Sequence, residues 1–361
     1  MSIKVGIIGC GGIANGKHLP SLKSLGDRVE LVAFCDIVIE RAEKAKAEYG
    51  TPDAKVYEDY KELLKDESIQ VVHVLTPNRE HSFISIDALH AGKHVMCEKP
   101  MAKTYAEAVA MCEAAKETGK LLTIGYQSRY RANSTHLKKM VENGELGEIY
   151  YAKAHAVRRR AVPTWGVFLN EEEQGGGPLI DIGTHALDLT LWEMDNYKPK
   201  MVMGTTYKKL SSQTNQGNAW GQWDPEKFTV EDSAFGMIVM ENGATINLEA
   251  AWALNTLDVI EASTTLCGTE AGADMRDGLR INGIHHNRQY TENVNMEAGG
   301  AAFYEGAGNG KPEEIECKVF YDAVEFGKEL CVKPEQAATV TRILEAIYTS
   351  AQTGKPVIFE D

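Results

Sequence analysis

The chain has 361 residues, of which 43% are hydrophobic and 25% are charged, and its formal net charge is −14. This composition is that of a globular protein, and the length favours two domains over one. The negative charge argues against nucleic acid or an anionic membrane as the main partner, and no apolar run is long enough to predict a transmembrane helix. Seven cysteines without CxxC pairs, together with an N-terminus that lacks a signal-peptide pattern, predict a cytoplasmic protein with reduced thiols.

The N-terminus combines a strand pattern with a glycine-rich turn. Residues 3–8 form a short β-branched run, which predicts a buried parallel strand. The GxGxxA pattern Gly9, Gly11 and Ala14 follows at once. The first glycine permits a tight turn, the second lets backbone N–H groups approach a pyrophosphate, and the small third residue lets a helix pack closely. We therefore expect Gly9, Gly11, Gly12 and Ile13 to bind a dinucleotide.

Asp36 follows the second predicted strand, residues 29–34. A carboxylate at this position accepts hydrogen bonds from the adenosine ribose hydroxyls and repels a 2′-phosphate. No Arg or Lys follows until Arg41, so the sequence favours NAD over NADP. The alternative role for Asp36 is that of a helix N-cap.

The first half of the chain continues as alternating strands and helices. Strand patterns cover 70–75, 94–97 and 121–124, and helix patterns cover 40–49, 60–64, 80–91 and 105–118. This alternation predicts a doubly wound parallel sheet, whose strand ends share one ligand crevice. We expect the nucleotide path to be lined by residues that follow these strands: Thr76, Pro77, Asn78, His81, Glu98 and Gln127. For His81, an exposed position in the first turn of a helix is the alternative.

Glu98-Lys99-Pro100 stands at the carboxyl end of the strand 94–97. Proline fixes φ and removes a backbone donor, so the chain turns there and directs Lys99 toward the crevice. Lys99 is therefore the first candidate for chemistry.

The pattern changes near Tyr126. A helix is predicted over 133–142, and long alternating runs over 149–157, 200–208, 228–240, 244–253 and 257–266 predict one open, mainly antiparallel sheet. The Asn242-Gly243 turn predicts a hairpin, 184–194 predicts a helix, and the Gly- and Asn-rich segment 274–310 predicts loops. Amphipathic helices at 320–330 and 335–349 are expected to pack back on the first domain. The predicted domains are 1–125, 126–314 and a C-terminal segment 315–361.

A second motif, GGGPLIDIGTH, spans residues 175–185. Its glycines predict the close approach of a ligand. Asp181 and His185 are four residues apart and share one helix face, with Asp188 one turn further on. They are either catalytic groups or a cap and a buried histidine held by Asp188. As a metal site the set matches no known spacing, so no metal is predicted.

Together the GxGxxA turn, Asp36, Glu98-Lys99-Pro100 and GGGPLIDIGTH resemble the Gfo/Idh/MocA family of NAD(P)-dependent sugar and cyclitol oxidoreductases. The resemblance covers essentially the whole chain. It implies a Rossmann-type domain, a second domain with an open sheet, and self-association through the outer face of that sheet. It also implies that Lys99, Asp181 and His185 act at the nicotinamide. One departure is Gln127, where many relatives carry Asn.

Residues 163–168, read together with GGGPLIDIGTHALDLTLW, resemble a bacterial subgroup that oxidises glycosides, often at C3. We therefore expect NAD-dependent oxidation of a secondary ring hydroxyl. His185 is the expected base and Lys99 the group that stabilises the oxygen, although a lysine with a lowered pKa is the alternative base. Asp181 would orient Lys99 and the sugar.

Three further residues are expected to contact the substrate: Tyr126, Arg129 and Trp165. For Trp165, core or interface packing is the alternative. Three other functions remain open on the sequence alone: a redox-neutral glycoside-cleaving enzyme that uses NAD transiently, a cyclitol dehydrogenase, and a non-catalytic NAD-binding regulator.

Overall fold

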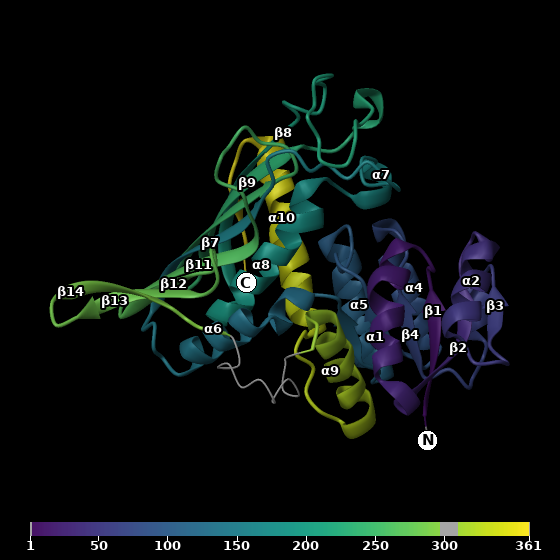
Figure 1. Ribbon diagram of the computed structural model, residues 1–361. Helices are drawn as coiled ribbons and strands as arrows, with labels where there is room; N and C mark the ends of the chain where they lie inside the picture. The colour runs from purple at the N-terminus through teal and green to yellow at the C-terminus, as the bar shows by residue number, and fades with distance from the viewer. Residues whose placement is uncertain (1, 297–309, 361) are drawn as a thin grey trace. The chain divides into compact units, whose positions relative to one another are not determined.

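The computed structural model describes residues 2–296 and 310–360 and divides the chain into two compact units (Figure 1). The first unit is Met1–Gln127 with Gly310–Ala338, and the second is Ser128–Asn309 with Thr339–Asp361. The predicted C-terminal segment 315–361 is thus divided between the two units rather than assigned wholly to the first. Across the described ranges, no helix has the length and apolar character that crossing a membrane requires.

The first unit contains a six-stranded parallel sheet in the order β3-β2-β1-β4-β5-β6. This order confirms the predicted doubly wound fold. The strands are β1 (Ile3–Ile8), β2 (Val29–Cys35), β3 (Lys55–Tyr57), β4 (Val71–Val74), β5 (His94–Cys97) and β6 (Leu122–Ile124). Only the short edge strand β3 was not predicted.

The helices of the first unit fall into two sets. One set shares an apolar core with the strands and consists of α1 (Leu19–Ser24), α2 (Ile39–Tyr49) and α9 (Pro312–Phe326). The other set, α3 (Tyr60–Leu64), α4 (His81–His90) and α5 (Tyr105–Thr118), packs together, with α4 against both neighbours. Helix α9 ends before the predicted limit of residue 330 because Gly327 adopts φ 65° and caps it.

The second unit contains a nine-stranded sheet in the order β14-β13-β12-β11-β7-β10-β9-β8-β15. The strands are β7 (Ile149–Val157), β8 (Pro199–Tyr207), β9 (Ser233–Met240), β10 (Thr245–Ala251), β11 (Ile260–Gly268), β12 (Ala271–Asp274), β13 (Arg280–His285), β14 (Arg288–Asn293) and β15 (Val357–Ile358). Neighbouring strands run antiparallel except β7 and β10, which are parallel. The predicted open, mainly antiparallel sheet and the β9–β10 hairpin at Asn242-Gly243 are confirmed.

The prediction of loops over 274–310 was wrong for residues 280–293, which form the β13–β14 ribbon. The ribbon turns at His286 and Asn287, which both have positive φ, 49° and 62°. This is the backbone that tight hairpins require. Most of its side chains are exposed, so no alternation of polar and apolar residues marks the strands. Residues 297–309 lie outside the described ranges.

Helices cover one face of the nine-stranded sheet. Helix α8 (Thr184–Met194) packs on β7 and β11, and α6 (Ala132–Glu142) packs on α8. Helix α10 (Pro334–Thr353) places Ile347 against Gly204 and Gly236, which are partners in the β8–β9 register. A Cβ on either glycine would lie within 2.6 Å of the Ile347 side chain, so the absence of side chains there lets the helix dock.

Candidate functional site

The glycine turn after β1 is tight at Gly9 and uncovered at Gly11 and Gly12. Gly9 has φ +93°, and a Cβ there would lie 2.6 Å from the Leu75 carbonyl oxygen, so only glycine fits. Around the Cβ positions of Gly11 and Gly12 no atom lies within 4 Å. The backbone at these two residues is therefore open to a ligand. The helix that follows is irregular, because a π-helical turn, Ala14–His18, precedes α1. Ile13 is 42% exposed beside the turn.

The Asp36 carboxylate is fixed against the glycine turn. Its Oδ2 accepts a hydrogen bond from Cys10 N at 2.9 Å, and its Oδ1 accepts one from Val38 N at 2.9 Å. Helix α2 has Val38 as its N-cap, so the N-cap alternative for Asp36 was wrong. A carboxylate has about four acceptor positions, which leaves capacity for ribose hydroxyls. Arg41 Nη1 lies 4.0 Å from Oδ1, which is closer than the spacing in sequence suggested.

Thr76 and His81 lie where β4 leads into α4. Thr76 Oγ1 is buried and has no hydrogen-bond partner within the described ranges. Such an unsatisfied hydroxyl is consistent with a group that hydrogen-bonds a ligand. His81 is only 1% exposed, so the exposed alternative was wrong. Its Nδ1 lies 2.7 Å from the Pro100 carbonyl oxygen and its Nε2 lies 2.9 Å from that of Thr76. Burial lowers the pKa of His81, and a neutral ring donates to one of these oxygens at a time. His81 thus braces the loops after β4 and β5.

Glu98 contacts protein groups rather than open space. Its carboxylate is buried, and Oε1 lies 2.7 Å from both Lys17 Nζ and His18 Nε2. Its Oε2 accepts a hydrogen bond from the Lys99 backbone N–H at 3.1 Å. The Lys99–Pro100 peptide that follows is cis. The prediction placed Glu98 on the nucleotide path; the structure shows it holding the backbone of Lys99.

A buried polar network extends from Glu98 to helix α9, and we call its members the Glu98 network: Lys17, His18, His73, Glu98, Glu316 and Tyr321. Lys17 Nζ also contacts Glu316 Oε2 at 2.9 Å. His18 Nδ1 lies 3.0 Å from His73 Nδ1, and His73 Nε2 lies 3.1 Å from the Tyr321 hydroxyl. Burial lowers the pKa of both histidines, so both rings are neutral. The chain of donors then has one direction, from Tyr321 through His73 and His18 to the Glu98 carboxylate.

The charges in this network are balanced by Lys17. Burial alone would lower the pKa of Lys17, but the carboxylates of Glu316 and Glu98 raise it. Burial alone would raise the pKa of Glu98, but Lys17 and His18 hold it well below its usual range. Burial raises the pKa of Glu316 to about 7 despite Lys17. No sequence pattern indicates this network, because its members come from separate parts of the chain.

In the second unit, the triple glycine packs against protein. Glu231, which is buried, accepts hydrogen bonds from Gly177 N at 2.8 Å, from Leu179 N at 3.0 Å and from the Tyr348 hydroxyl at 2.9 Å. A Cβ on Gly177 would lie 2.3 Å from the Glu231 carbonyl oxygen, and one on Gly176 would lie 2.0 Å from the Tyr348 hydroxyl. The prediction that these glycines let a ligand approach closely was wrong for Gly176 and Gly177, because Tyr348 and Glu231 fill the space beside them.

Asp181 and His185 lie on consecutive turns of one continuous helix. The π-helical turn Leu179–Gly183 holds Asp181 and leads directly into α8, which holds His185. Such π turns are frequent at functional sites. Trp252 Nε1 donates a hydrogen bond to Asp181 Oδ2 at 3.0 Å and fixes the carboxylate. Both residues are partly exposed, as a site for a substrate requires, although Nδ1 of His185 is buried.

Asp188 is paired with Arg129. Arg129 Nε donates to Asp188 Oδ2 at 2.9 Å and Nη2 donates to Oδ1 at 2.6 Å, and both side chains are fully buried. Asp188 is therefore a structural partner of Arg129 rather than a third metal ligand or the group that holds His185. Within 2–296 and 310–360, no group of three or more His, Cys, Asp and Glu side chains is arranged to hold a metal.

The three predicted substrate contacts have different surroundings. Arg129 and Tyr126 are both 0% exposed, so the prediction that they form a pocket wall is replaced by a role in the core. Trp165 is 52% exposed, so the alternative of core packing was wrong for it. Its ring lies 5.0 Å from that of Trp220, which the sequence did not single out. Gln127 begins a short helical turn, Gln127–Tyr130, at the unit boundary.

Two family models match this chain. Residues 3–126 match an oxidoreductase family described as having an NAD-binding Rossmann fold, and residues 138–359 match its C-terminal alpha/beta domain. The chain belongs to the Gfo/Idh/MocA oxidoreductase family. It is therefore an oxidoreductase with an NAD-binding domain, as the two sequence motifs predicted.

Curated relatives of this family member include sugar and cyclitol dehydrogenases. The chain is 36% identical over 355 residues to the D-glucoside 3-dehydrogenase of Escherichia coli K12, covering 98% of this chain and 97% of the relative. It is 36% identical over 166 residues to the inositol 2-dehydrogenase of Salmonella typhimurium LT2, covering 46% and 49%.

Solved structures of similar fold support the same architecture. The aldose-aldose oxidoreductase from Caulobacter crescentus, complexed with glycerol, aligns with a TM-score of 0.79 at 25% identity, covering 99% of this chain and 100% of that chain. Levoglucosan dehydrogenase in complex with NADH and levoglucosan aligns with a TM-score of 0.84 at 22% identity, covering 99% of both chains. At that identity the second comparison shows the fold alone.

Proposed function

We propose that this protein is an NAD-dependent dehydrogenase that oxidises a secondary ring hydroxyl of a sugar or glycoside, at C3, to a ketone. The observation that carries the proposal is the full-length identity of 36% with a relative named D-glucoside 3-dehydrogenase. The same similarity favours a dehydrogenase over the redox-neutral glycoside-cleaving enzyme. The inositol 2-dehydrogenase relatives make a cyclitol the second candidate substrate, although they match only about half of the chain.

The proposed cofactor is NAD rather than NADP. Two observations support this proposal: the space beside Gly11 and Gly12 is open, and the fixed Asp36 carboxylate has acceptor capacity left for ribose hydroxyls. A 2′-phosphate would meet the negative charge of Asp36. When bound, NAD supplies the hydride acceptor at the nicotinamide, and the protein supplies position and electrostatics.

In the proposed mechanism, Lys99, Asp181 and His185 act on the same substrate. Loss of a hydride from a carbinol carbon is easy only if the hydroxyl proton also leaves, so a base is required. His185 takes that proton, because imidazole titrates near the working pH. Lys99 donates a hydrogen bond to the same oxygen and stabilises its developing negative charge. Asp181, oriented by Trp252, accepts hydrogen bonds from Lys99 and from neighbouring sugar hydroxyls.

The deciding experiment follows the NADH absorbance band after glucose, methyl glucoside or myo-inositol is added to the protein with NAD. Lys99→Ala is expected to abolish turnover while NAD still binds, and Lys103→Ala, a change in the same loop, is the matched control. Near-normal turnover by Lys99→Ala would contradict the assignment. Release of an aglycone without net NADH would indicate the glycoside-cleaving class. Bound NAD without any product would indicate a regulator.

The identity of the base is tested by pH profiles. If His185 is the base, His185→Gln loses the acidic limb of kcat, whereas a conservative Lys99→Arg variant keeps this limb at a lower rate. The reverse result would assign the proton to Lys99 as the alternative base.

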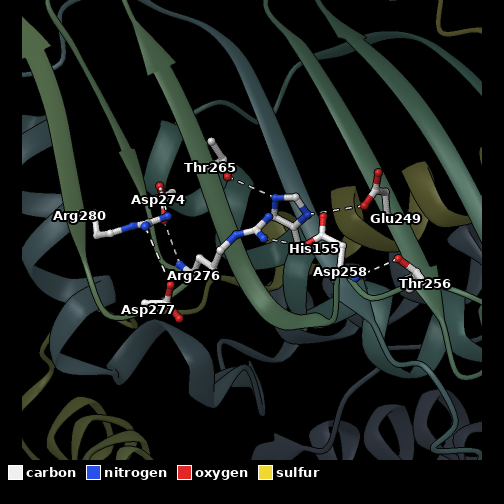
Figure 2. Close-up of polar contacts among 9 residues, drawn as sticks. All are labelled: His155, Glu249, Thr256, Asp258, Thr265, Asp274, Arg276, Asp277 and Arg280. Carbon is white, nitrogen blue, oxygen red and sulfur yellow. Dashed lines mark hydrogen bonds and ion pairs between the residues drawn. The ribbon is translucent and has the colours of Figure 1, made fainter. Parts of the chain in front are cut away.

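We also propose that the protein is a homo-oligomer that buries the outer face of its nine-stranded sheet. Met203 and Met237, which are neighbours in the β8–β9 register, are 44% and 41% exposed. By strand register, the same face carries a polar group on β7, β10 and β11. In this group His155 lies 3.2 Å from Thr265 Oγ1 and 3.6 Å from Glu249 Oε2 (Figure 2). A sheet face with exposed methionines favours a partner. Met237→Asp should lower the mass measured by light scattering, and an unchanged mass would contradict this interface.

The proposed location is the cytoplasm. All seven cysteines are free thiols, as expected in a reducing compartment. Cell fractionation that recovers the protein with a cytoplasmic marker would support this, and recovery with a secreted or membrane fraction would refute it.

A further inference from the structure

A row of aromatic side chains leads from Asp181 to the surface of the second unit. Trp252, which is fully buried, bonds Asp181 through its Nε1. Its ring centroid lies 6.4 Å from that of Phe168, and the Phe168 centroid lies 6.0 Å from that of Trp165. Trp165 is followed by Trp220 at 5.0 Å. Each pair is arranged edge to face, which is a favourable aromatic geometry.

The outer pair of this row, Trp165 and Trp220, is exposed although it is large and apolar. Trp165 is 52% exposed and Trp220 is 42% exposed. A single exposed apolar residue needs no explanation, but two adjacent tryptophans that continue a row from a candidate catalytic carboxylate form a patch of the kind that marks a ligand surface.

The loop that holds Trp220 is fixed rather than free. Asn218 Oδ1 accepts a hydrogen bond from Val162 N at 2.8 Å, and Asn218 Nδ2 donates to the Val162 carbonyl oxygen at 3.0 Å. Thr164 Oγ1 donates to the Trp220 carbonyl oxygen at 2.7 Å. These bonds join the segment around Trp220 to the segment that holds Trp165, so the two rings form one unit whose geometry is set before a ligand arrives.

The ring of Trp220 also has a positive group next to it. The Arg158 guanidinium lies 5.2 Å from the Trp220 ring centroid and is neutralised by Glu261, which it contacts at 2.6 and 2.5 Å. Arg158 is therefore paired within the protein, and what the outer pair offers a ligand is chiefly aromatic surface. Such a surface binds flat apolar faces.

We propose that Trp165 and Trp220 form a subsite for the aglycone of a glycoside, and that this aglycone presents a flat apolar face, either an aromatic ring or the C–H face of a second sugar. The proposal rests on the proposed function, because it takes the reacting sugar to lie at Asp181. An aglycone is joined to that sugar by a single glycosidic bond, and the row of rings starts at Asp181 and continues outward. A free monosaccharide would leave the two exposed tryptophans without a role.

The test compares four substrates: glucose, methyl glucoside, phenyl glucoside and a glucosyl-glucose disaccharide. For wild type we expect kcat/KM to be higher for phenyl glucoside or for the disaccharide than for methyl glucoside. For Trp220→Ala we expect the ratio of kcat/KM for the favoured glycoside over methyl glucoside to fall roughly fivefold, mainly through KM, which is the size of one aromatic contact. Trp220→Phe should restore most of the ratio. Phe83→Ala, which removes a 45% exposed aromatic from the first unit, is the matched control and should leave the ratio unchanged.

The outcomes distinguish an aromatic aglycone from a second sugar, and they distinguish failure of the subsite from failure of the proposed function. Loss of the phenyl preference alone identifies an aromatic aglycone, and loss of the disaccharide preference alone identifies a second sugar. An unchanged ratio in Trp220→Ala, or an equal loss on all four substrates, overturns the subsite while the dehydrogenase stands. A changed oligomeric mass with an unchanged ratio overturns it in favour of a contact between copies of the chain. The absence of turnover on every sugar, with wild type, would be a failure of the proposed function itself.

Discussion

Lys17→Met tests whether the Glu98 network holds the fold and the Lys99 loop together. Methionine keeps an unbranched side chain of similar length but removes the charge that contacts Glu98 at 2.7 Å and Glu316 at 2.9 Å. The side chains of the three residues are at most 10% exposed, so water cannot replace the ammonium group. Two carboxylates would then be left buried together.

The expected loss follows from this geometry. Removing one partner of a buried ion pair costs about 3–5 kcal/mol of the free energy of unfolding. Glu316, whose pKa is about 7, takes up a proton near neutral pH at little cost, so the loss should lie near 3 kcal/mol at pH 7. Without Lys17 both carboxylates favour the protonated form in the folded state. The destabilisation should therefore grow as pH rises from 6 to 8, because the folded protein holds protons that the unfolded chain has released, and holding them costs more free energy at each higher pH.

The assay is urea unfolding of the cofactor-free protein at pH 6, 7 and 8, followed by circular dichroism. Lys55→Met is the matched control, because Lys55 contacts Asp66 at 3.0 Å but its side chain is 63% exposed. This control should show little or no loss. The kcat of Lys17→Met should also fall, because Glu98 Oε2 holds the Lys99 backbone. If Lys17→Met unfolds like Lys55→Met, or if its loss does not grow with pH, the reasoning is refuted.

Three further changes test other parts of the structure. Gly177→Ala places a Cβ 2.3 Å from the Glu231 carbonyl oxygen, so the turn that holds Asp181 must shift by about 1 Å. The kcat/KM should then fall on the order of 100-fold with NAD affinity retained. A fall below twofold would contradict this. Asp36→Ser removes the negative charge beside Arg41. The kcat/KM measured with NADP, divided by the kcat/KM measured with NAD, should therefore rise on the order of tenfold. An unchanged ratio would show that Asp36 does not select the cofactor. Burial raises the pKa of Glu193 to about 8, so wild type loses stability as pH rises from about 4.5 to 8. Glu193→Gln should therefore melt higher than wild type by several degrees at pH 8.5 and by a smaller margin at pH 6. An equal margin at both pH values would disprove the reasoning.

Most of the fold could be predicted because strands and helices here follow local patterns. Residues 3–8 are rich in β-branched side chains and mostly buried, and the alternation of strand and helix patterns that follows them indicates a parallel sheet. The β13–β14 ribbon could not be predicted in this way, since its exposed side chains show no alternation and its turn residues, His286 and Asn287, are not the usual pair.

The site could be predicted only where a motif marks it. Lys99, Asp181 and Asp36 stand in recognisable motifs, but the motifs do not say what each neighbouring residue contacts. Glu98 is predicted to line the nucleotide path because it follows a strand, whereas its partners in the structure come from distant parts of the chain. Arg129 is predicted to contact the substrate, whereas its pairing with Asp188 is a property of the packed core that no local pattern reveals.

The interleaving of the two units sets the order in which the protein can be completed during synthesis. The core of the first unit combines β1, β2 and α1 with Phe320 and Tyr321 of α9, and these two residues leave the ribosome after all of Ser128–Asn309. Until then the N-terminal segment lacks part of its apolar core, and Lys17 lacks Glu316. A nascent or truncated chain that ends at Gln127 is therefore expected to remain incompletely packed and to depend on chaperones, whereas permuting the chain so that α9 precedes β1 would let this unit fold on its own.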